Sequence, residues 1–562
     1  MKILIEGEKY PINDLREIFD DSKFYHQEGQ YGTILSVGYY YSFMKPLKKS
    51  QIVYMLPKVF MKTNEETVFG ISKSSLFNLE QSETIKHKEE YNWIRQISVY
   101  FYNSLLEFKR RNKLSTIVQS SLSTNLNTNL NEQEYSYLDM LLSFVNFYKK
   151  NKNNVLFKHI EFKSQQVRKP NWDKTIRKSV PLITQGGQPI YSVFRNKKRI
   201  INTEEELLVY FFSILNHFNN DHNLNLKIDK SYQLIEGRKF KLLQENGLSK
   251  LRKIKYRYFN DTLKKMYHLC EIYFSQTDKS SVKNRREEFI SVSNYNLVFE
   301  DMIDKLFSDP IVDKNTKDGV TLKNLKYNDD GKIIDHIFDY QSILDTSDIF
   351  YIGDSKYYKS DNSAGKVSKY KQFTYAKNVI QYNIDLLNET GTYYKENLRY
   401  RDKLTEGYNI TPNFFIYGYI NDYKNFEFPE LSEKGDIIKS FHFEDRLFDR
   451  DTLFVHQYKI NFLYVLKAYT RFGNLSIGNF RATIKNRFRE NFIHFFSDEN
   501  KSGFSLYEFK EDDIKYFVDL NFRKINGKCF RTKENKLILA LHRKDKTISN
   551  LTSYFKKFEF PR

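Results

Sequence analysis

The stretch IFYIGDSKYYKS, residues 349–360, ends an apolar run with an acid and a lysine. Residues 349–353 have the composition of a buried strand, and Asp354 and Lys356 follow at a spacing of two. Because side chains two apart on a strand point to the same face of a sheet, we expect this carboxylate and this ammonium group side by side. The segment therefore predicts a strand whose end presents two opposite charges at one place.

A second strand-like run, GKIIDHIFDY at residues 331–340, lies upstream and carries Asp335 in its middle. The short polar connection QSILDTSD favours a β-hairpin centred near Leu344. In a symmetric hairpin Asp335 faces Asp354 or its neighbour, with Cβ atoms about 4.5–5.5 Å apart. Two carboxylates so close repel, and one takes up a proton unless a cation lies between them. Mg²⁺, with Mn²⁺ as the alternative ion, accepts such a pair and completes its shell with water and phosphate oxygens, while Lys356 stabilises the phosphate charge.

The D-x-K spacing alone carries little information, because it recurs at Asp21, Asp422 and Asp513. Asp354 differs from these three because a second acidic strand precedes it. The simpler interpretation of the central segment is an ordinary charged hairpin without catalytic function.

These residues resemble the PD-(D/E)XK nuclease core, in which one acid precedes a strand pair that ends in acid-x-Lys. Upstream, NLVFEDMIDKLF (296–307) is an amphipathic helix, and the resemblance implies that its Glu300 helps to bind metal. Downstream, KYKQFTYAKNVI (369–380) places Gln372 and Tyr375 on one helix face, similar to the helix that follows the catalytic strands in several branches of the superfamily. The simpler interpretations are a solvated Glu300 and a packed Tyr375.

A narrower resemblance rests on four segments of the sequence. They are IIDHIF, FYIGDSKYYK, KPNWDKTI (169–176) and PIYSVF (189–194). Together they resemble the LlaJI family of restriction endonucleases, which is related to the McrC subunit of McrBC-type systems. The resemblance implies an endonuclease subunit of a restriction or modification-dependent defence system, activated by a McrB-like AAA+ GTPase. The chain has no GxxxxGK[ST] motif of its own, which agrees with that division of labour. It is longer than McrC subunits, so the additional segments could serve DNA recognition or another partner.

Two alternatives stay open at this point. The chain could act chiefly as a regulatory or bridging subunit that docks on a GTPase motor and stimulates it, with cleavage secondary. It could also be a repair or transposase-type nuclease on the same fold.

Charge favours a polyanionic partner, for which we expect double-stranded DNA. The chain has 90 basic and 70 acidic residues, a formal net charge of +20. Two segments, 237–259 and 471–491, are basic at polar positions with aromatic residues between them. A solvated helix face is the simpler interpretation, and contact with phosphates is the functional one. The candidate DNA-binding residues are Arg238, Lys239, Lys250, Arg252, Lys253, Lys255, Arg257, Arg481, Lys485, Arg487 and Arg489.

A chain of 562 residues is too long for one core, and its pattern predicts a multidomain α+β fold. We expect a β-rich and helical N-terminal domain for partner docking or DNA contact, a basic helical middle region, a PD-(D/E)XK mixed α/β core, and a mixed C-terminal extension. Their expected ranges are 1–200, 201–289, 290–425 and 426–562.

The expected location is the cytoplasm, away from membranes. Charge at Glu6 interrupts the start before a signal-peptide core can form. No run reaches the about 20 apolar residues that span a bilayer. Two cysteines are too few for a disulfide framework or a thiolate zinc site.

Overall fold

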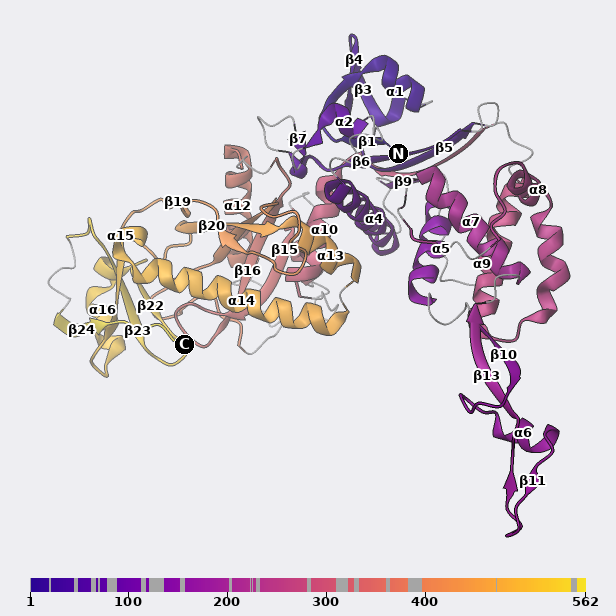
Figure 1. Ribbon diagram of the computed structural model, residues 1–562. Helices are drawn as coiled ribbons and strands as arrows, with labels where there is room; N and C mark the ends of the chain where they lie inside the picture. The colour runs from indigo at the N-terminus through magenta and orange to yellow at the C-terminus, as the bar shows by residue number, and fades with distance from the viewer. Residues whose placement is uncertain are drawn as a thin grey trace. The chain divides into compact units, whose positions relative to one another are not determined.

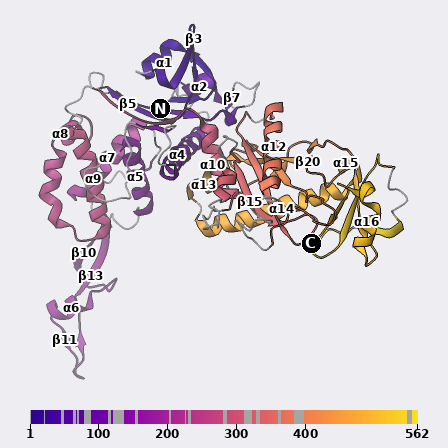
Figure 2. The same ribbon diagram turned by 180° about the vertical axis from the view of Figure 1, so that it is seen from behind.

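The computed structural model describes most of the chain as two compact units (Figures 1 and 2). The first unit comprises residues 39–53 and 119–290, and the second comprises residues 2–38, 54–118 and 291–562. The described residues are 2–19, 22–44, 49–61, 67–68, 71–77, 88–112, 118–120, 136–151, 157–201, 205–222, 224, 226–228, 233–279, 285–309, 322–327, 333–359, 364–382, 397–471, 473–546 and 553–561.

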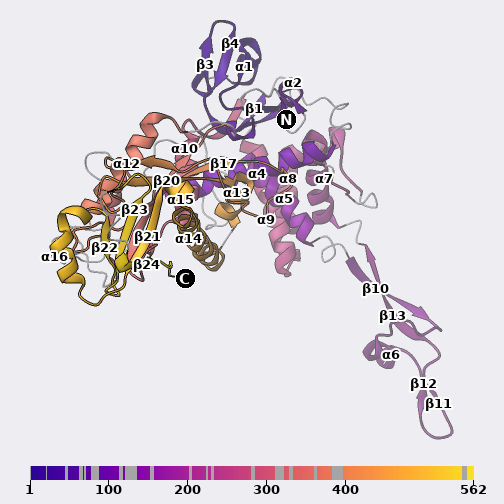
Figure 3. The same cartoon turned by 90° about the vertical axis from the view of Figure 1, so that its left-hand side faces the viewer.

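Helices form the body of the first unit (Figure 3), and many of their buried core residues are aromatic. Phe144 stacks on Phe211 with ring centroids 5.0 Å apart, and Phe218 meets Tyr273 edge-on at 5.6 Å. Strands β6, β5, β14 and β9 are neighbours in that order. The elements are β5 (Val37–Met44), β6 (Lys49–Leu56), β9 (Val118–Ser120), α5 (Tyr137–Asn151), α7 (Glu206–His222), α8 (Gly237–Ile254), η3 (Lys255–Arg257), α9 (Asp261–Lys279) and β14 (Arg285–Val292).

A long hairpin extends from these helices, as Figure 1 shows within this unit. Strands β10 (Phe157–Ser164) and β13 (Phe194–Ile201) pair antiparallel up to Ser164 opposite Phe194. The segment between them, residues 165–193, forms the tip of the hairpin. The tip contains α6 (Trp172–Lys178) and the short pair β11 (Leu182–Ile183) and β12 (Pro189–Ile190).

The second unit begins with short N-terminal strands and helices and a long helix, α4. Helix α4 packs on α13 through Phe101 and Phe462, whose rings stack at 6.0 Å. These parts are β1 (Lys2–Ile5), β2 (Lys9–Pro11), α1 (Ile12–Ile18), η1 (Ser22–Phe24), β3 (Tyr25–Glu28), β4 (Tyr31–Ile34), η2 (Lys58–Phe60), β7 (Thr67–Val68), β8 (Ile71–Ser72), α2 (Lys73–Phe77) and α4 (Lys88–Arg111).

A mixed sheet is the centre of the second unit, with strand order β15-β16-β17-β20-β18 and β19 beside β20. Strands β15 and β16 form an antiparallel hairpin, and β16, β17 and β20 run parallel, with α12 crossing over from β16 to β17. The elements are α10 (Tyr295–Phe307), α11 (Leu322–Lys326), β15 (His336–Gln341), β16 (Asp348–Lys356), α12 (Lys366–Tyr382), β17 (Pro412–Tyr419), β18 (Ser432–Glu433), β19 (Ile438–Ser440), β20 (Leu453–Asn461), α13 (Phe462–Arg471) and α14 (Asn474–Ser497).

Helices cover both faces of this sheet. Asn413 hydrogen-bonds Gln372 of α12, whereas the ring of Phe414 lies 4.7 Å from that of Phe488 on α14. Because neighbouring residues of a strand point to opposite faces, these contacts define an α12 face and an α14 face. Helix α10 lies on the α14 face, where Phe307 stacks on Phe488.

The C-terminal part of the chain forms a second, antiparallel sheet with strand order β22-β23-β21-β24. This sheet shares an apolar core with α14. Its elements are α15 (Glu499–Ser502), β21 (Phe504–Phe509), α16 (Ile514–Ile525), β22 (Cys529–Arg531), β23 (Leu537–His542) and β24 (Phe555–Lys557).

The predicted multidomain α+β class is confirmed by these mixed sheets and helices. The predicted 1–200 region is distributed between both units, because residues 2–38 and 54–118 pack with residues 291–562. Within the described ranges, no helix is long and apolar enough to cross a membrane.

Candidate active site

The two predicted acids lie opposite each other at the open end of the β15–β16 hairpin. His336 is paired with Gly353, so one further step of the same register sets Asp335 against Asp354. The main-chain N–H of Ser355 donates a hydrogen bond to the Oδ2 atom of Asp335 at 3.2 Å. The hairpin register predicted from the sequence is therefore the one that the structure adopts.

Asp354 and Lys356 share the α12 face of β16. Asp354 is paired with Phe415 of β17 and Lys356 with Tyr417. The Nζ atom of Lys356 bonds the Oδ2 atom of Asp354 and lies 5.2 Å from the ring centroid of Phe415. Both charged groups are mostly buried, so their attraction is screened less than at a surface.

Crowding of like charges changes the ionisation of two carboxyl groups here. Burial raises the pKa of Asp335 well above its ordinary value, and the nearby Asp354 and Glu300 raise it further. Burial and Asp354 also raise the pKa of Glu300 to about 7, against the opposing effect of Lys356. This repulsion between carboxylates is relieved when a cation binds to them.

The donor set fits a magnesium-like ion in part. Asp335 and Asp354 supply two facing carboxylates, the number that Mg²⁺ uses when water and phosphate complete its shell. Among the residues that the structure describes, no three or more His, Cys, Asp or Glu side chains form a metal-binding group. The predicted role of Glu300 as a direct ligand stays a prediction.

Gln372 and Tyr375 are both on the buried side of α12. The side-chain amide of Gln372 donates to Asn413 Oδ1 at 2.5 Å, and Asn413 returns a hydrogen bond to the main-chain carbonyl of Gln372 at 3.2 Å. Asn413 is paired with Ile352, two residues before Asp354. Gln372 thus fixes α12 to the strand beside the acids, while its own Oε1 has no hydrogen-bond partner among the described atoms.

Tyr417, a neighbour of Lys356, and Lys434 beside Tyr417 were not predicted from the sequence. Tyr417 faces Lys356 across the parallel ladder, and burial raises the pKa of its hydroxyl to about 12. The Nζ atom of Lys434 lies 3.9 Å from the ring centroid of Tyr417. The alternation Phe415-x-Tyr417 repeats the spacing of Asp354-x-Lys356, which is the signal that could have identified Tyr417.

The N-terminal segment holds the end of the same strand. Tyr357, the residue after Lys356, is buried and its hydroxyl hydrogen-bonds the carboxylate of Glu6. Lys359 pairs with Glu8 at 3.1 Å. These contacts connect residues 2–38 directly to the proposed site within one unit.

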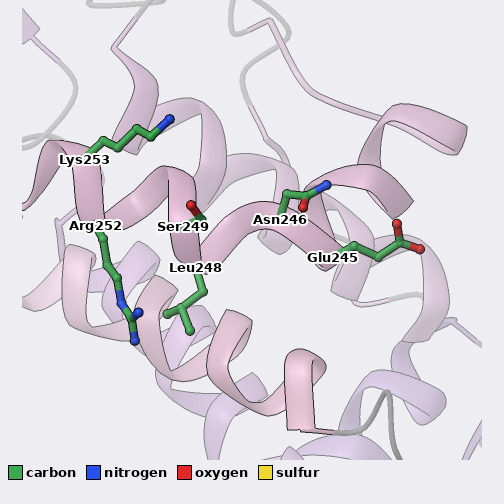
Figure 4. A pocket seen from close by; sticks show the side chains of 6 residues that line it. All are labelled: Glu245, Asn246, Leu248, Ser249, Arg252 and Lys253. Carbon is green, nitrogen blue, oxygen red and sulfur yellow. The ribbon is translucent and has the colours of Figure 1, made fainter.

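The predicted basic residues of the first unit are all exposed on α8 and η3. Beside them, Tyr256 and Phe259 are each 84% exposed. A shallow hollow of about 450 Å³ runs along α8 (Figure 4), and its lining mixes one acid with two cations. The lining residues are Glu245, Asn246, Leu248, Ser249, Arg252 and Lys253.

The predicted basic residues of α14 have different surroundings. Arg481 donates to the carbonyl of Lys305, and Lys485 bonds both carboxylate oxygens of Asp309. Arg489 is 3% exposed and donates to the carbonyls of Ser342 and Pro561. Of the four predicted residues on this helix, Arg487 is the one classed as exposed.

No family model matches this sequence, and a search of curated proteins finds no match either. Inference about function therefore depends on the residues of the hairpin and their geometry.

Proposed function

We propose that the chain is a divalent-metal-dependent DNA endonuclease subunit of a restriction or modification-dependent defence system. The observation that carries the proposal is the facing pair of Asp335 and Asp354, with Lys356 bonded to Asp354 on the same face of the strand. This arrangement supports the proposal because it is similar to the acid, acid-x-Lys set of the nuclease core that the sequence resembles.

The proposed roles follow from charge. Asp335 and Asp354 would hold Mg²⁺ or Mn²⁺, which when bound supplies a Lewis acid and a water of lowered pKa. The Lys356 ammonium group stabilises the negative charge that develops on the phosphate when water adds to phosphorus and the P–O bond to the leaving oxygen breaks. Glu300 increases the negative potential that attracts the ion.

The direct test replaces each group in the set. We expect Asp335→Asn, Asp354→Asn and Lys356→Ala each to reduce Mg²⁺-dependent cleavage of plasmid DNA by at least about 100-fold, since metal and charge stabilisation contribute several kcal/mol. Asp348→Asn is a matched control, because Asp348 begins the same strand on the same face. A double variant should be hardly worse than a single one, because the groups act as a unit. Undiminished cleavage by either Asp335→Asn or Asp354→Asn would overturn the proposal.

Activation by a second protein is part of the proposal. A nuclease that contacts DNA mainly through its phosphates needs another source of specificity, and the chain has no P-loop motif. We expect slow cleavage by the chain alone and faster, sequence- or modification-dependent cleavage with a McrB-like AAA+ GTPase and GTP. Rapid site-specific cleavage by the isolated chain would contradict partner control.

A second candidate function, docking on the motor as a regulatory subunit, is favoured by the hairpin tip. Seven large apolar side chains are exposed between residues 167 and 190, an unusual density for a surface that stays free. They are Val167, Trp172, Ile176, Val180, Leu182, Ile183 and Ile190.

Removing the tip separates docking from cleavage. Residues 165–193 can be replaced by Asn-Gly, because Ser164 and Phe194 are already paired and a two-residue turn closes such a ladder. We expect this variant to lose GTPase stimulation while Asp354→Asn retains it. Undiminished partner binding by the tip deletion would exclude the tip as the docking surface. Deleting residues 1–200 is a poor substitute, because it also removes segments that pack on the nuclease sheet.

A further inference from the structure

The α14 face of the hairpin, behind the acids, carries a buried polar network. His336 follows Asp335 and Ser355 follows Asp354, so both point away from the carboxylates. The Nε2 atom of His336 lies 2.5 Å from the Oγ atom of Ser355. His336 is 0% and Ser355 5% exposed, so this hydrogen bond joins β15 and β16 inside the core.

Gly353 leaves room for the ring of Phe414 beside this bond. It faces His336 across the ladder, and a Cβ atom at this position would lie 2.0 Å from the ring of Phe414. The imidazole of His336 reaches diagonally across the ladder to Ser355. The main-chain N–H of Ser355 also donates a hydrogen bond to Asp335 Oδ2. Ser355 is therefore hydrogen-bonded to both Asp335 and His336, whose side chains point to opposite faces of the hairpin.

Helix α10 joins the network through Asp304. Its Oδ1 atom accepts hydrogen bonds from Lys326 Nζ and Ser308 Oγ, each at 2.5 Å. The same oxygen lies 3.5 Å from His336 Nδ1, a distance of electrostatic contact rather than a good hydrogen bond. Ser308 Oγ in turn accepts from the N–H of Ile337 at 3.2 Å, which ties the end of α10 to β15.

The position of Asp304 relates this network to the acids. Asp304 is one turn after Glu300, so the two carboxylates lie on one side of α10. Asp304 is therefore bonded behind the hairpin, while the charge of Asp354 helps to raise the pKa of Glu300.

Serine, histidine and aspartate in this order are also the groups of a hydrolase triad. A triad serine must be reached by its substrate, whereas Ser355 and His336 are enclosed, and Asp304 is shared with Lys326. The arrangement thus lacks the access that nucleophilic catalysis requires.

We propose that Asp304, His336 and Ser355 are positioning residues that hold α10, β15 and β16 in the spacing needed for divalent-cation binding by Asp335 and Asp354. This inference rests on the proposed nuclease function. Groups that orient metal ligands typically change metal affinity or activity by about 10- to 100-fold when removed.

The test uses Ser355→Ala, His336→Leu and the conservative His336→Gln. His456→Leu is the matched control, because His456 is buried in the same cross-strand row, His336–Gly353–Phe414–His456, on the same face. Mn²⁺ affinity of the full chain is measured by calorimetry, together with the thermal unfolding midpoint and, with partner and GTP, the maximal cleavage rate.

We expect both His→Leu variants to lower the unfolding midpoint, but only His336→Leu and Ser355→Ala to weaken Mn²⁺ binding by at least about tenfold and to slow cleavage in parallel. His336→Gln should recover part of both losses, since its amide can bond Ser355. Unchanged Mn²⁺ affinity in Ser355→Ala, or equal losses in His336→Leu and His456→Leu, would overturn the positioning role. A wild-type chain that neither binds Mn²⁺ nor cuts DNA would instead overturn the proposed function.

Discussion

Helices α8 and α14 have similar compositions, with lysines and arginines between aromatic residues, but their cations have different surroundings. On α8 the predicted basic residues are exposed. On α14, Arg481, Lys485 and Arg489 bind carbonyl and carboxylate groups of the same unit. The cations of a basic helix can thus be exposed and open to a polyanion in one place, and bonded to groups of their own unit in another.

The spacing of the basic residues on α14 explains why they bond groups within their own unit. Arg481, Lys485 and Arg489 recur every four residues and lie beside a buried stripe that includes Phe488. Their aliphatic stems cover apolar surface while their charged heads reach acceptors at its margin. Lys305, Asp309 and Ser342 among these acceptors are more than 140 residues away along the chain, which is why composition alone did not separate the two helices.

The largest expected effect in this comparison is that of Arg489→Ala on stability. The change leaves the carbonyls of Ser342 and Pro561 without their donor and opens a cavity, so we expect a loss of about 3 kcal/mol in the free energy of unfolding. Arg252→Ala on α8 is the control and should change it by less than about 0.5 kcal/mol.

Tryptophan fluorescence during urea unfolding can measure this loss in the second unit alone. Trp93 belongs to the second unit and is buried, whereas Trp172 belongs to the first unit and is half exposed. In a Trp172→Phe background, the signal therefore reports the unit that contains α14. Arg252→Ala is followed by far-UV circular dichroism instead, because α8 belongs to the first unit. A loss there as large as that of Arg489→Ala would contradict the distinction between the helices.

Lys485→Ala is expected to have a smaller effect, about 1–2 kcal/mol. Burial already raises the pKa of Asp309, and Lys485 opposes that shift. Without Lys485 the carboxyl of Asp309 is left beside Asp339 with no cation bonded to it. A double-mutant cycle with Asp309→Asn measures the pair, and we expect a coupling of about 1 kcal/mol. Strictly additive losses would mean that Lys485 contributes only packing.

The hairpin illustrates what the sequence could predict. Its strands are apolar runs whose side chains alternate between two faces, its connection is short, and these features are local. The pairing near Leu344 and the meeting of Asp335 with Asp354 could therefore be derived. The same alternation predicted that Asp354 and Lys356 share a face. The metal itself and the catalytic activity stay predictions.

Long-range contacts were beyond the sequence analysis. Nothing local to Tyr357 indicates that Glu6 meets it, and nothing local to Arg489 indicates that it bonds Ser342. Gln372 and Tyr375 share a helix face as expected, yet that face is buried, and Gln372 bonds Asn413 of a strand that follows in the chain. Such contacts depend on tertiary packing rather than on spacing.

Neutralising α8 should change DNA binding with almost no change in stability. We expect the triple variant Lys250→Gln, Arg252→Gln and Lys253→Gln to unfold within about 0.5 kcal/mol of wild type. The slope of log affinity against log salt should become shallower by up to about three, since each phosphate contact contributes about 0.9. Lys264→Gln with Lys265→Gln on the neighbouring α9 controls for loss of net charge, because both lysines are exposed. An unchanged slope in the triple variant would remove α8 from the DNA-binding surface.

The smallest expected effect is that of Arg487→Gln, and it decides whether α14 contacts DNA at all. Arg481, Lys485 and Arg489 are held by internal acceptors, and releasing any of them would leave buried carbonyls or a carboxylate unsatisfied. DNA could therefore recruit only Arg487 among the predicted residues of this helix, and its removal should reduce the salt slope by no more than about one. Fluorescence anisotropy of a labelled duplex at several salt concentrations measures this, with Arg252→Gln on α8 as the matched exposed arginine. A decrease well above one would show that Arg481, Lys485 or Arg489 also contacts DNA. No decrease, beside a clear one for Arg252→Gln, would leave α14 only a structural role beside the central sheet of the second unit.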